Sequence, residues 1–123
     1  MTIGSVAIDP VSGTKPTCAA VVGCGVIGAA WAARLVLHGV DVSISDPTSD
    51  ASATFDAVLA NAVVAYDDLG LATDDRGAVR FASSIADAVA DVEFVQESVP
   101  ERIDVKVAVL AEIEAAAPTD ALI

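Results

Sequence analysis

The sequence is poor in aromatic residues, basic residues, cysteine and histidine, and each shortage excludes something. Aromatic residues make up 4% of the 123 positions although 54% are hydrophobic, so the core must be built mainly from aliphatic side chains. Six Lys and Arg residues stand against 18 Asp and Glu residues, giving a formal net charge of −12. This charge argues against nucleic acid or an anionic membrane as a partner. Any phosphate group bound here must be held mainly by backbone amides.

The cysteine pattern predicts neither a disulfide nor a metal site. Cys18 and Cys24 fall on one extended stretch, so their Cα atoms are expected roughly 20 Å apart, several-fold beyond disulfide reach. No His or Cys spacing typical of a metal site occurs. The first 15 residues lack the apolar segment of a secretory signal, and the uncharged run 18–33 is too short to span a membrane. We therefore expect a cytoplasmic protein with two free thiols and no membrane partner.

Residues 17–123 alternate strand-like and helix-like segments behind a leader. Residues 1–16 contain two prolines and two glycines and are predicted to be flexible. The predicted strands are residues 18–22, 40–46, 79–81, 91–99 and 121–123. The predicted helices are residues 26–38, 48–69, 84–89 and 101–116. This alternation predicts a single α/β domain with a doubly wound parallel sheet, cut near its fifth strand.

Local signals indicate where the helices begin and which faces they bury. Thr48 or Ser49 is expected to cap the second helix, and Ser83 or Ser84 the third. One apolar stripe is expected on the last helix, formed by Ile103, Val107, Leu110 and Ile113.

Residues 19–28, AAVVGCGVIG, carry the strongest functional signal, because a buried-type strand runs into G-x-G-x-x-G and then a helix. Gly23 allows a tight turn, Gly25 lets the backbone approach a phosphate, and Gly28 lets the helix pack closely. The free N–H groups and positive dipole end of that helix would face an anion. The pattern predicts that the pyrophosphate of a dinucleotide binds at residues 23–28.

Asp46 ends the second predicted strand, 18 positions after Gly28. A carboxylate at this point accepts the hydroxyl groups of an adenosine ribose and repels a 2′-phosphate, which favours NAD over NADP. The alternative interpretation is an ordinary turn-forming Asp before Pro47. The glycine loop upstream favours the ribose role.

Other candidate residues carry weaker signals. His38, the single histidine, falls at the end of the first helix away from the glycine loop, where an imidazole complements the helix dipole. It is therefore not expected to be catalytic. Trp31 is expected to pack rather than to stack on a ligand. The acidic tract 67–75 lacks the alternating spacing of a calcium loop and is interpreted as a solvated loop.

Residues 96–101, QESVPE, are the second informative segment. They fall at the carboxyl end of a predicted strand, where open α/β sheets bind ligands. Glu101, in the first turn of the next predicted helix, is placed for a ribose hydroxyl, and Lys106 follows five residues later. From the residues alone, a helix-terminal acid and a solvated lysine are an equally good interpretation.

The loop GCGVIGAAWA (23–32), Asp46-Pro47, the segment FVQESVPE (94–101) and Lys106 together resemble the NAD-binding domain of the 3-hydroxyacyl-CoA dehydrogenase family. Trp31 and QESVPE look most like its L-carnitine dehydrogenase and lambda-crystallin branch. The resemblance implies a Rossmann-type fold over residues 17–123. It also implies a pyrophosphate on the glycine loop, the adenosine ribose on Asp46, and the nicotinamide ribose beside the segment 98–106.

The cofactor-binding residues expected on this basis are Gly23, Cys24, Gly25, Val26, Ile27, Gly28, Asp46, Ser98, Glu101 and Lys106. The resemblance also implies that a catalytic His–Glu pair and a helical dimerisation domain would follow Ile123. No catalytic residue is therefore expected in this chain.

The intact enzyme would oxidise a small 3-hydroxy substrate as a homodimer, with a general base taking the hydroxyl proton while hydride passes to NAD. The residues present would at most bind NAD. Two other functions stay open, namely a stand-alone NAD-binding or sensing module and a methyltransferase-type nucleotide domain.

Overall fold

A computed structural model describes residues 15–123, and most of the leader predicted for residues 1–16 lies outside the described residues. Its four strands are all parallel, in the order β3-β2-β1-β4. Their bounds are Cys18–Val22 (β1), Asp41–Ser45 (β2), Val79–Phe81 (β3) and Phe94–Glu97 (β4). Because the chain moves outward in both directions from β1, the sheet is doubly wound. The predicted α/β fold class is confirmed.

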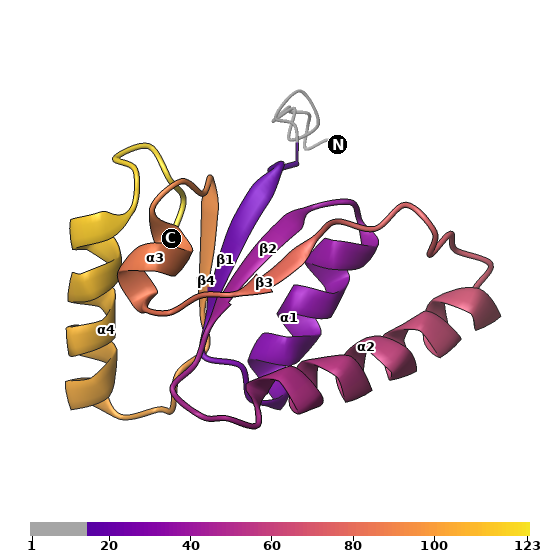
Figure 1. The fold of residues 1–123 in the computed structure, drawn as a ribbon, viewed down its shortest axis with the longest axis horizontal. Coiled ribbons are helices and arrows are strands. Elements are labelled where there is room, and N and C mark those ends of the chain that lie inside the picture. Colours follow the sequence, from indigo (N-terminus) through magenta and orange to yellow (C-terminus); the bar gives the residue numbers. More distant parts are fainter. Residues whose placement is uncertain (1–14) are drawn as a thin grey trace, which may run out of the picture.

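Two helices cover each face of this sheet (Figure 1). The helices α1 (Val26–Leu37) and α2 (Ala51–Asp68) lie on one face, and α3 (Ile85–Val89) and α4 (Ile103–Ala116) lie on the other. Successive side chains of a strand point to opposite faces. Val21 of β1 accordingly packs under α1, and its neighbours Ala20 and Val22 pack under α3 and α4.

The core is aliphatic, as the shortage of aromatic residues predicts. On the α1–α2 side, Ile44 of β2 is 0% exposed and packs with Phe55, the one aromatic residue among the buried side chains of the described chain. On the α3–α4 side, Ile113 of α4 is also 0% exposed and packs with Val95 of β4. Each face therefore has its own core, with β1 contributing to both.

The edge of the sheet beyond β4 carries the start of a fifth strand. Phe94 forms a single parallel bridge with Leu122. The N–H of Val95 donates to the carbonyl of Leu122 at 2.8 Å, and the N–H of Leu122 donates to the carbonyl of Glu93 at 3.0 Å. The strand predicted at residues 121–123 thus lies beside β4 and is limited to one bridge.

Several predicted boundaries are wrong by a few residues. The helix α2 begins after Asp50 rather than at Thr48 or Ser49, because the Thr48 hydroxyl donates to Asp46 instead of capping the helix. The strand β4 is shorter than the predicted 91–99. The helix α4 begins at Ile103 rather than at residue 101, since the N–H of Arg102 donates to the Pro100 carbonyl in a preceding turn.

The predicted apolar stripe of α4 is also wrong in its first half. Ile103 is 83% exposed and Val107 is 63% exposed, whereas Ile113 is fully buried. Partly buried Val109 and Leu110 complete the contact with the sheet. Apolar residues occur on every side of α4, so their spacing alone does not select the buried face.

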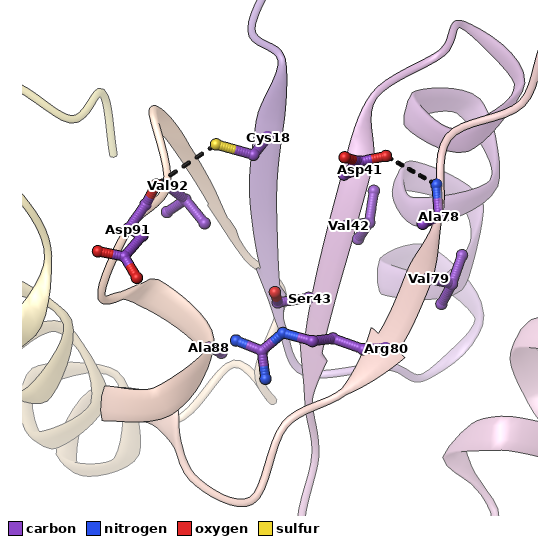
Figure 2. Close-up of a pocket in the computed structure, with 10 residues that line it drawn as sticks. All are labelled: Cys18, Asp41, Val42, Ser43, Ala78, Val79, Arg80, Ala88, Asp91 and Val92. Carbon is purple, nitrogen blue, oxygen red and sulfur yellow. Dashed lines mark hydrogen bonds between the residues drawn. The ribbon is translucent and has the colours of Figure 1, made fainter.

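A cavity of about 370 Å³ lies near the amino ends of the strands, between the sheet and α3 (Figure 2). Arg80 of β3 reaches across it, and its Nη1 lies 3.0 Å from Oδ2 of Asp87 in α3. At the rim, Oδ1 of Asp41 accepts from the N–H of Ala78 at 2.8 Å. Asp41 thus fixes the segment before β3 at the amino end of β2, and the Arg80 ion pair joins β3 to α3.

Candidate functional site

The turn between β1 and α1 is built on Gly23, whose φ is +93°. Its N–H donates to the carbonyl of Ser45 at 2.8 Å, which fixes the turn to the end of β2. A Cβ at Gly23 would lie 2.8 Å from the carbonyl carbon of Ser98. Glycine is therefore required both by the positive φ and by the close passage of the segment that follows β4.

The other two glycines of the loop differ in what surrounds them. A Cβ at Gly28 would lie 1.8 Å from the carbonyl oxygen of Gly23, so the first turn of α1 packs directly on the turn below it. A Cβ at Gly25 would meet no protein atom within 4 Å. Gly25 is the N-cap of α1, and the first N–H groups of a helix have no partner within it. Its bare backbone therefore leaves room for an anion at the positive end of the helix.

A cleft of about 710 Å³ opens in front of this loop, at the carboxyl ends of β1, β2 and β4. Nine of the ten residues expected to bind a cofactor line it, and Gly28 lies buried beneath. The lining residues with polar side chains are Asp46, Thr48, Thr54, Gln96, Glu97, Ser98, Glu101 and Lys106. The structure therefore brings together the two sequence segments singled out above, which are about 70 residues apart along the chain.

Asp46 is fixed in the cleft by three donors. Its Oδ2 accepts from the N–H of Cys24 at 2.6 Å, and its Oδ1 accepts from the N–H and the hydroxyl of Thr48 at 2.8 and 2.7 Å. Partial burial raises the pKa of Asp46, but these hydrogen bonds outweigh burial and hold the pKa below its ordinary value. Asp46 is thus ionised at neutral pH and already oriented towards the glycine loop.

Cys24 lies inside the loop as a buried, unreactive thiol. Burial, with a smaller effect from the Asp46 charge, raises the pKa of Cys24 to about 11. Its Sγ lies 3.8 Å from the carbonyl oxygen of Ala51, at the start of α2. Since the thiolate is the reactive form, this side chain serves packing rather than redox chemistry.

The opposite wall of the cleft is organised by Glu97, the last residue of β4. Its Oε2 accepts from the N–H of Val99 at 2.7 Å, and both carboxylate oxygens lie 2.9 Å from Nζ of Lys106. Hydrogen bonding to Glu97 raises the pKa of Lys106, against an opposing effect of desolvation. Glu101 lies farther from Nζ, at 3.6 Å, and its side chain is 91% exposed. The side chain of Lys106 therefore lines the cleft and is held in position by Glu97.

Sequence reasoning missed Thr48 as a cleft residue and assigned no role to Glu97, although Glu97 lies in the segment 96–101 that it singled out. A signal for Glu97 was present, because an acid at the carboxyl end of β4 satisfies the same criterion that singled out Asp46. A hydroxyl two positions after Asp46 was also visible but was assigned to a helix cap. Both residues contact site residues that the sequence did identify.

The residues interpreted as structural lie outside the cleft. His38 is the C-cap of α1, and its Nε2 lies 3.2 Å from the hydroxyl of Tyr66 in α2. The ring centroid of Trp31 lies 6.5 Å from that of Phe94 in β4, although Trp31 stays 39% exposed. Both placements match the sequence interpretation. No helix among residues 15–123 is long and apolar enough to cross a membrane.

An apolar cavity of about 580 Å³ adjoins the cleft beside Asp46. Asp46, Thr48 and Pro100 line both spaces. The walls of the cavity come from the carboxyl ends of the strands and the segments that follow them, together with Ile85 of α3 and Val109 of α4. The cleft therefore continues past the end of β2 into a hydrophobic recess.

Comparison with known proteins decides the family. The NAD-binding domain of 3-hydroxyacyl-CoA dehydrogenases matches residues 18–123. The chain belongs to this family, and NAD is its cofactor. The resemblance noted in the sequence and the Rossmann-type fold are both confirmed.

The relatives are metabolic dehydrogenases. The chain is 52% identical over 108 residues to an L-carnitine dehydrogenase from Mesorhizobium japonicum, covering 85% of this chain and 29% of that protein. It is 46% identical over 105 residues to an L-carnitine dehydrogenase from Pseudomonas aeruginosa, covering 85% of this chain and 33% of that protein. A solved structure of an NAD⁺-dependent dismutase, 5-formyl-3-hydroxy-2-methylpyridine 4-carboxylic acid 5-dehydrogenase, has a TM-score of 0.74 and 33% identity, with 86% and 35% of the two chains covered. The chain thus spans about a third of the length of its relatives.

Proposed function

We propose that NAD lies across the carboxyl edge of the sheet and that this chain is the cofactor-binding part of a dehydrogenase acting on a small 3-hydroxy compound. The observation that carries the proposal is the free space in front of Gly25, at the first turn of α1. In a chain with six basic residues, partner-free backbone N–H groups are the main available donors for a pyrophosphate.

The adenosine half of NAD is assigned to the β2 side of the cleft. The ionised Asp46 carboxylate accepts from a hydroxyl group of the adenosine ribose. The adjoining hydrophobic recess, of about 580 Å³, accommodates the adenine ring. A 2′-phosphate would meet the negative charge of Asp46, so NADP is disfavoured.

The nicotinamide half is assigned to the β4 side. Ser98, Glu101 and Lys106 line this end of the cleft. The ammonium group of Lys106 and the carboxylate of Glu101 supply a donor and an acceptor for the nicotinamide ribose. Glu97 holds Lys106 in place.

The full reaction needs groups beyond those described here. NAD supplies the hydride acceptor, while a general base has to take the proton of the substrate hydroxyl. We assign that base, the substrate pocket and the contacts of a homodimer to the portion of the relatives that this chain does not match. We place the protein in the cytoplasm, in keeping with its two free thiols. Carnitine and 3-hydroxyacyl-CoA are the two substrate types that this family suggests.

Isothermal titration of the chain with NAD, NADP and S-adenosylmethionine tests the proposal. We expect NAD to bind most tightly of the three. Asp46→Asn should weaken NAD binding about tenfold and reduce the ratio of NAD affinity to NADP affinity. Asp41→Asn is the matched control and leaves binding unchanged, because Asp41 also accepts from a backbone N–H, that of Ala78, but lies at the opposite end of β2. Tightest binding of S-adenosylmethionine, or no binding of NAD, would refute the proposal.

A further inference from the structure

The acceptor sites of Asp46 are nearly all taken before any ligand arrives. An ionised carboxylate offers about four lone-pair positions. Oδ1 accepts from both the N–H and the hydroxyl of Thr48, and Oδ2 accepts from the N–H of Cys24. One position therefore remains, on Oδ2.

A ribose diol has two hydroxyl groups to place. With one lone pair left, Asp46 satisfies a single hydroxyl group unless a bond to the loop or to Thr48 is broken. A buried hydroxyl without a partner is costly, so the second group needs another acceptor near Asp46.

Thr48 provides such an acceptor. Its hydroxyl hydrogen is directed to Asp46, which leaves the two lone pairs of Oγ1 free to accept. Thr48 lines both the cleft and the adjoining hydrophobic recess, so it lies at the junction between the regions assigned to pyrophosphate and adenine.

We propose that Thr48 and Asp46 together bind the adenosine ribose. One ribose hydroxyl donates to Oδ2 of Asp46 and the other donates to Oγ1 of Thr48. The proposal rests on the NAD binding proposed above. It also makes Thr48 a specificity residue, because a 2′-phosphate dianion has no hydrogen to donate. That phosphate would face the lone pairs of Thr48 as well as the charge of Asp46.

Titration calorimetry of Thr48→Val and Thr48→Ser with NAD and NADP tests this pairing. Thr48→Val keeps the shape and loses the hydroxyl, and we expect about three- to tenfold weaker NAD binding and no loss of NADP binding. Thr48→Ser restores the affinity for NAD. Thr73→Val is a matched control. The hydroxyl of Thr73, which lies between α2 and β3 and outside the cleft, also donates to an acid, Asp67 of α2.

NAD analogues lacking the 2′- or the 3′-hydroxyl of the adenosine ribose show whether Thr48 contacts the ribose directly or only holds Asp46 in position. If Thr48 touches a hydroxyl, Thr48→Val adds no further penalty for the analogue that lacks that group. An equal penalty for NAD and both analogues, or wild-type affinity in Thr48→Val, would overturn the inference while leaving NAD binding intact. Failure of the wild-type chain to bind NAD would instead overturn the proposed function, and this inference with it.

Discussion

The two walls of the cofactor cleft come from regions of very different burial. In the first unit, β1-α1-β2, four of the five residues in each strand are buried, and α1 buries six residues. In the second unit, β4 and α4 bury one residue each. The pyrophosphate wall is thus part of the central core, whereas the nicotinamide wall stands on an edge strand and an exposed helix.

The two walls are also held together by different interactions. The first wall is held by the N–H of Gly23, which donates to the Ser45 carbonyl, and by the Asp46 carboxylate, which accepts from the N–H of Cys24. The second wall is held by one backbone bond to β1, from the N–H of Ser98 to the Val22 carbonyl at 2.8 Å, and by the ion pair of Glu97 with Lys106 on the exposed helix α4. We infer that the first wall has a fixed shape and that the second can adjust when the rest of a substrate site is present.

The largest effect is expected from Gly28→Ala in the first unit. The new Cβ would overlap the Gly23 carbonyl at 1.8 Å, so we expect about 3 kcal/mol or more of lost stability in urea unfolding. Gly25→Ala is the matched change, because its Cβ meets no protein atom. It should cost under about 1 kcal/mol of stability yet weaken NAD binding more than tenfold. Equal stability losses for the two variants would contradict the packing described for the loop.

The cores on the two faces of the sheet are expected to differ in how much stability each loses when a buried side chain is shortened. Ile44 of β2 and Ile113 of α4 are both 0% exposed. Ile→Ala in a core costs about 2–5 kcal/mol, and the amount depends on how well the surroundings relax. We expect Ile44→Ala near the upper end and Ile113→Ala near the lower end, because α4 is exposed on most sides. Urea unfolding at equilibrium measures both, and the reverse order would show that the second unit is the tighter one.

Glu97→Gln probes the side chains of the second wall. Losing the negative partner of Lys106 should weaken NAD binding about threefold and leave the secondary structure unchanged, as followed by calorimetry and circular dichroism. Asp41→Asn again serves as control, because Asp41 lies at the amino end of β2, away from the cleft. A loss as large as that of Gly25→Ala would mean that the second wall is as rigidly required as the first.

The smallest effect is expected from pH across the neutral range. The lowered pKa of Asp46 and the raised pKa of Lys106 keep both groups charged, so NAD affinity should stay flat from about pH 5 to about pH 9. Protonation of Asp46 would remove the negative charge that accepts the ribose hydroxyl, and its lowered pKa moves that protonation to a more acidic pH. Affinity should therefore drop only below the ordinary carboxylate range of about 4. A drop near pH 6 would exclude Asp46 as the titrating group.

The first unit was far easier to predict from the sequence than the second. The strand Cys18–Val22 and the helix following Gly25 are as predicted, because glycine spacing and an uninterrupted apolar run allow few alternatives. Outside the first unit, the short strand Val79–Phe81 is also as predicted, and Ser84 is one of the two residues expected to cap α3. Local chemistry decides each of these features.

Features that depend on distant contacts were not predictable in this way. The buried face of α4 was misjudged because Ile103 and Val107 fit a helical stripe but have no neighbour to cover them. The role of Glu97 depends on Lys106, nine residues later, and on the N–H of Val99. Thr48 is drawn away from α2 by Asp46, a competition that propensity alone does not reveal.

The bond from the Cys24 amide to the Asp46 carboxylate has a consequence for redesign. An exchange of Asp46 for a small neutral residue, the obvious step towards accepting a phosphorylated coenzyme, would also leave the Cys24 N–H without its acceptor. The Asp46 side chain therefore determines both the preference for NAD over NADP and the order of the glycine loop. A successful switch has to supply a new acceptor for that amide as well as a cationic group for the added phosphate.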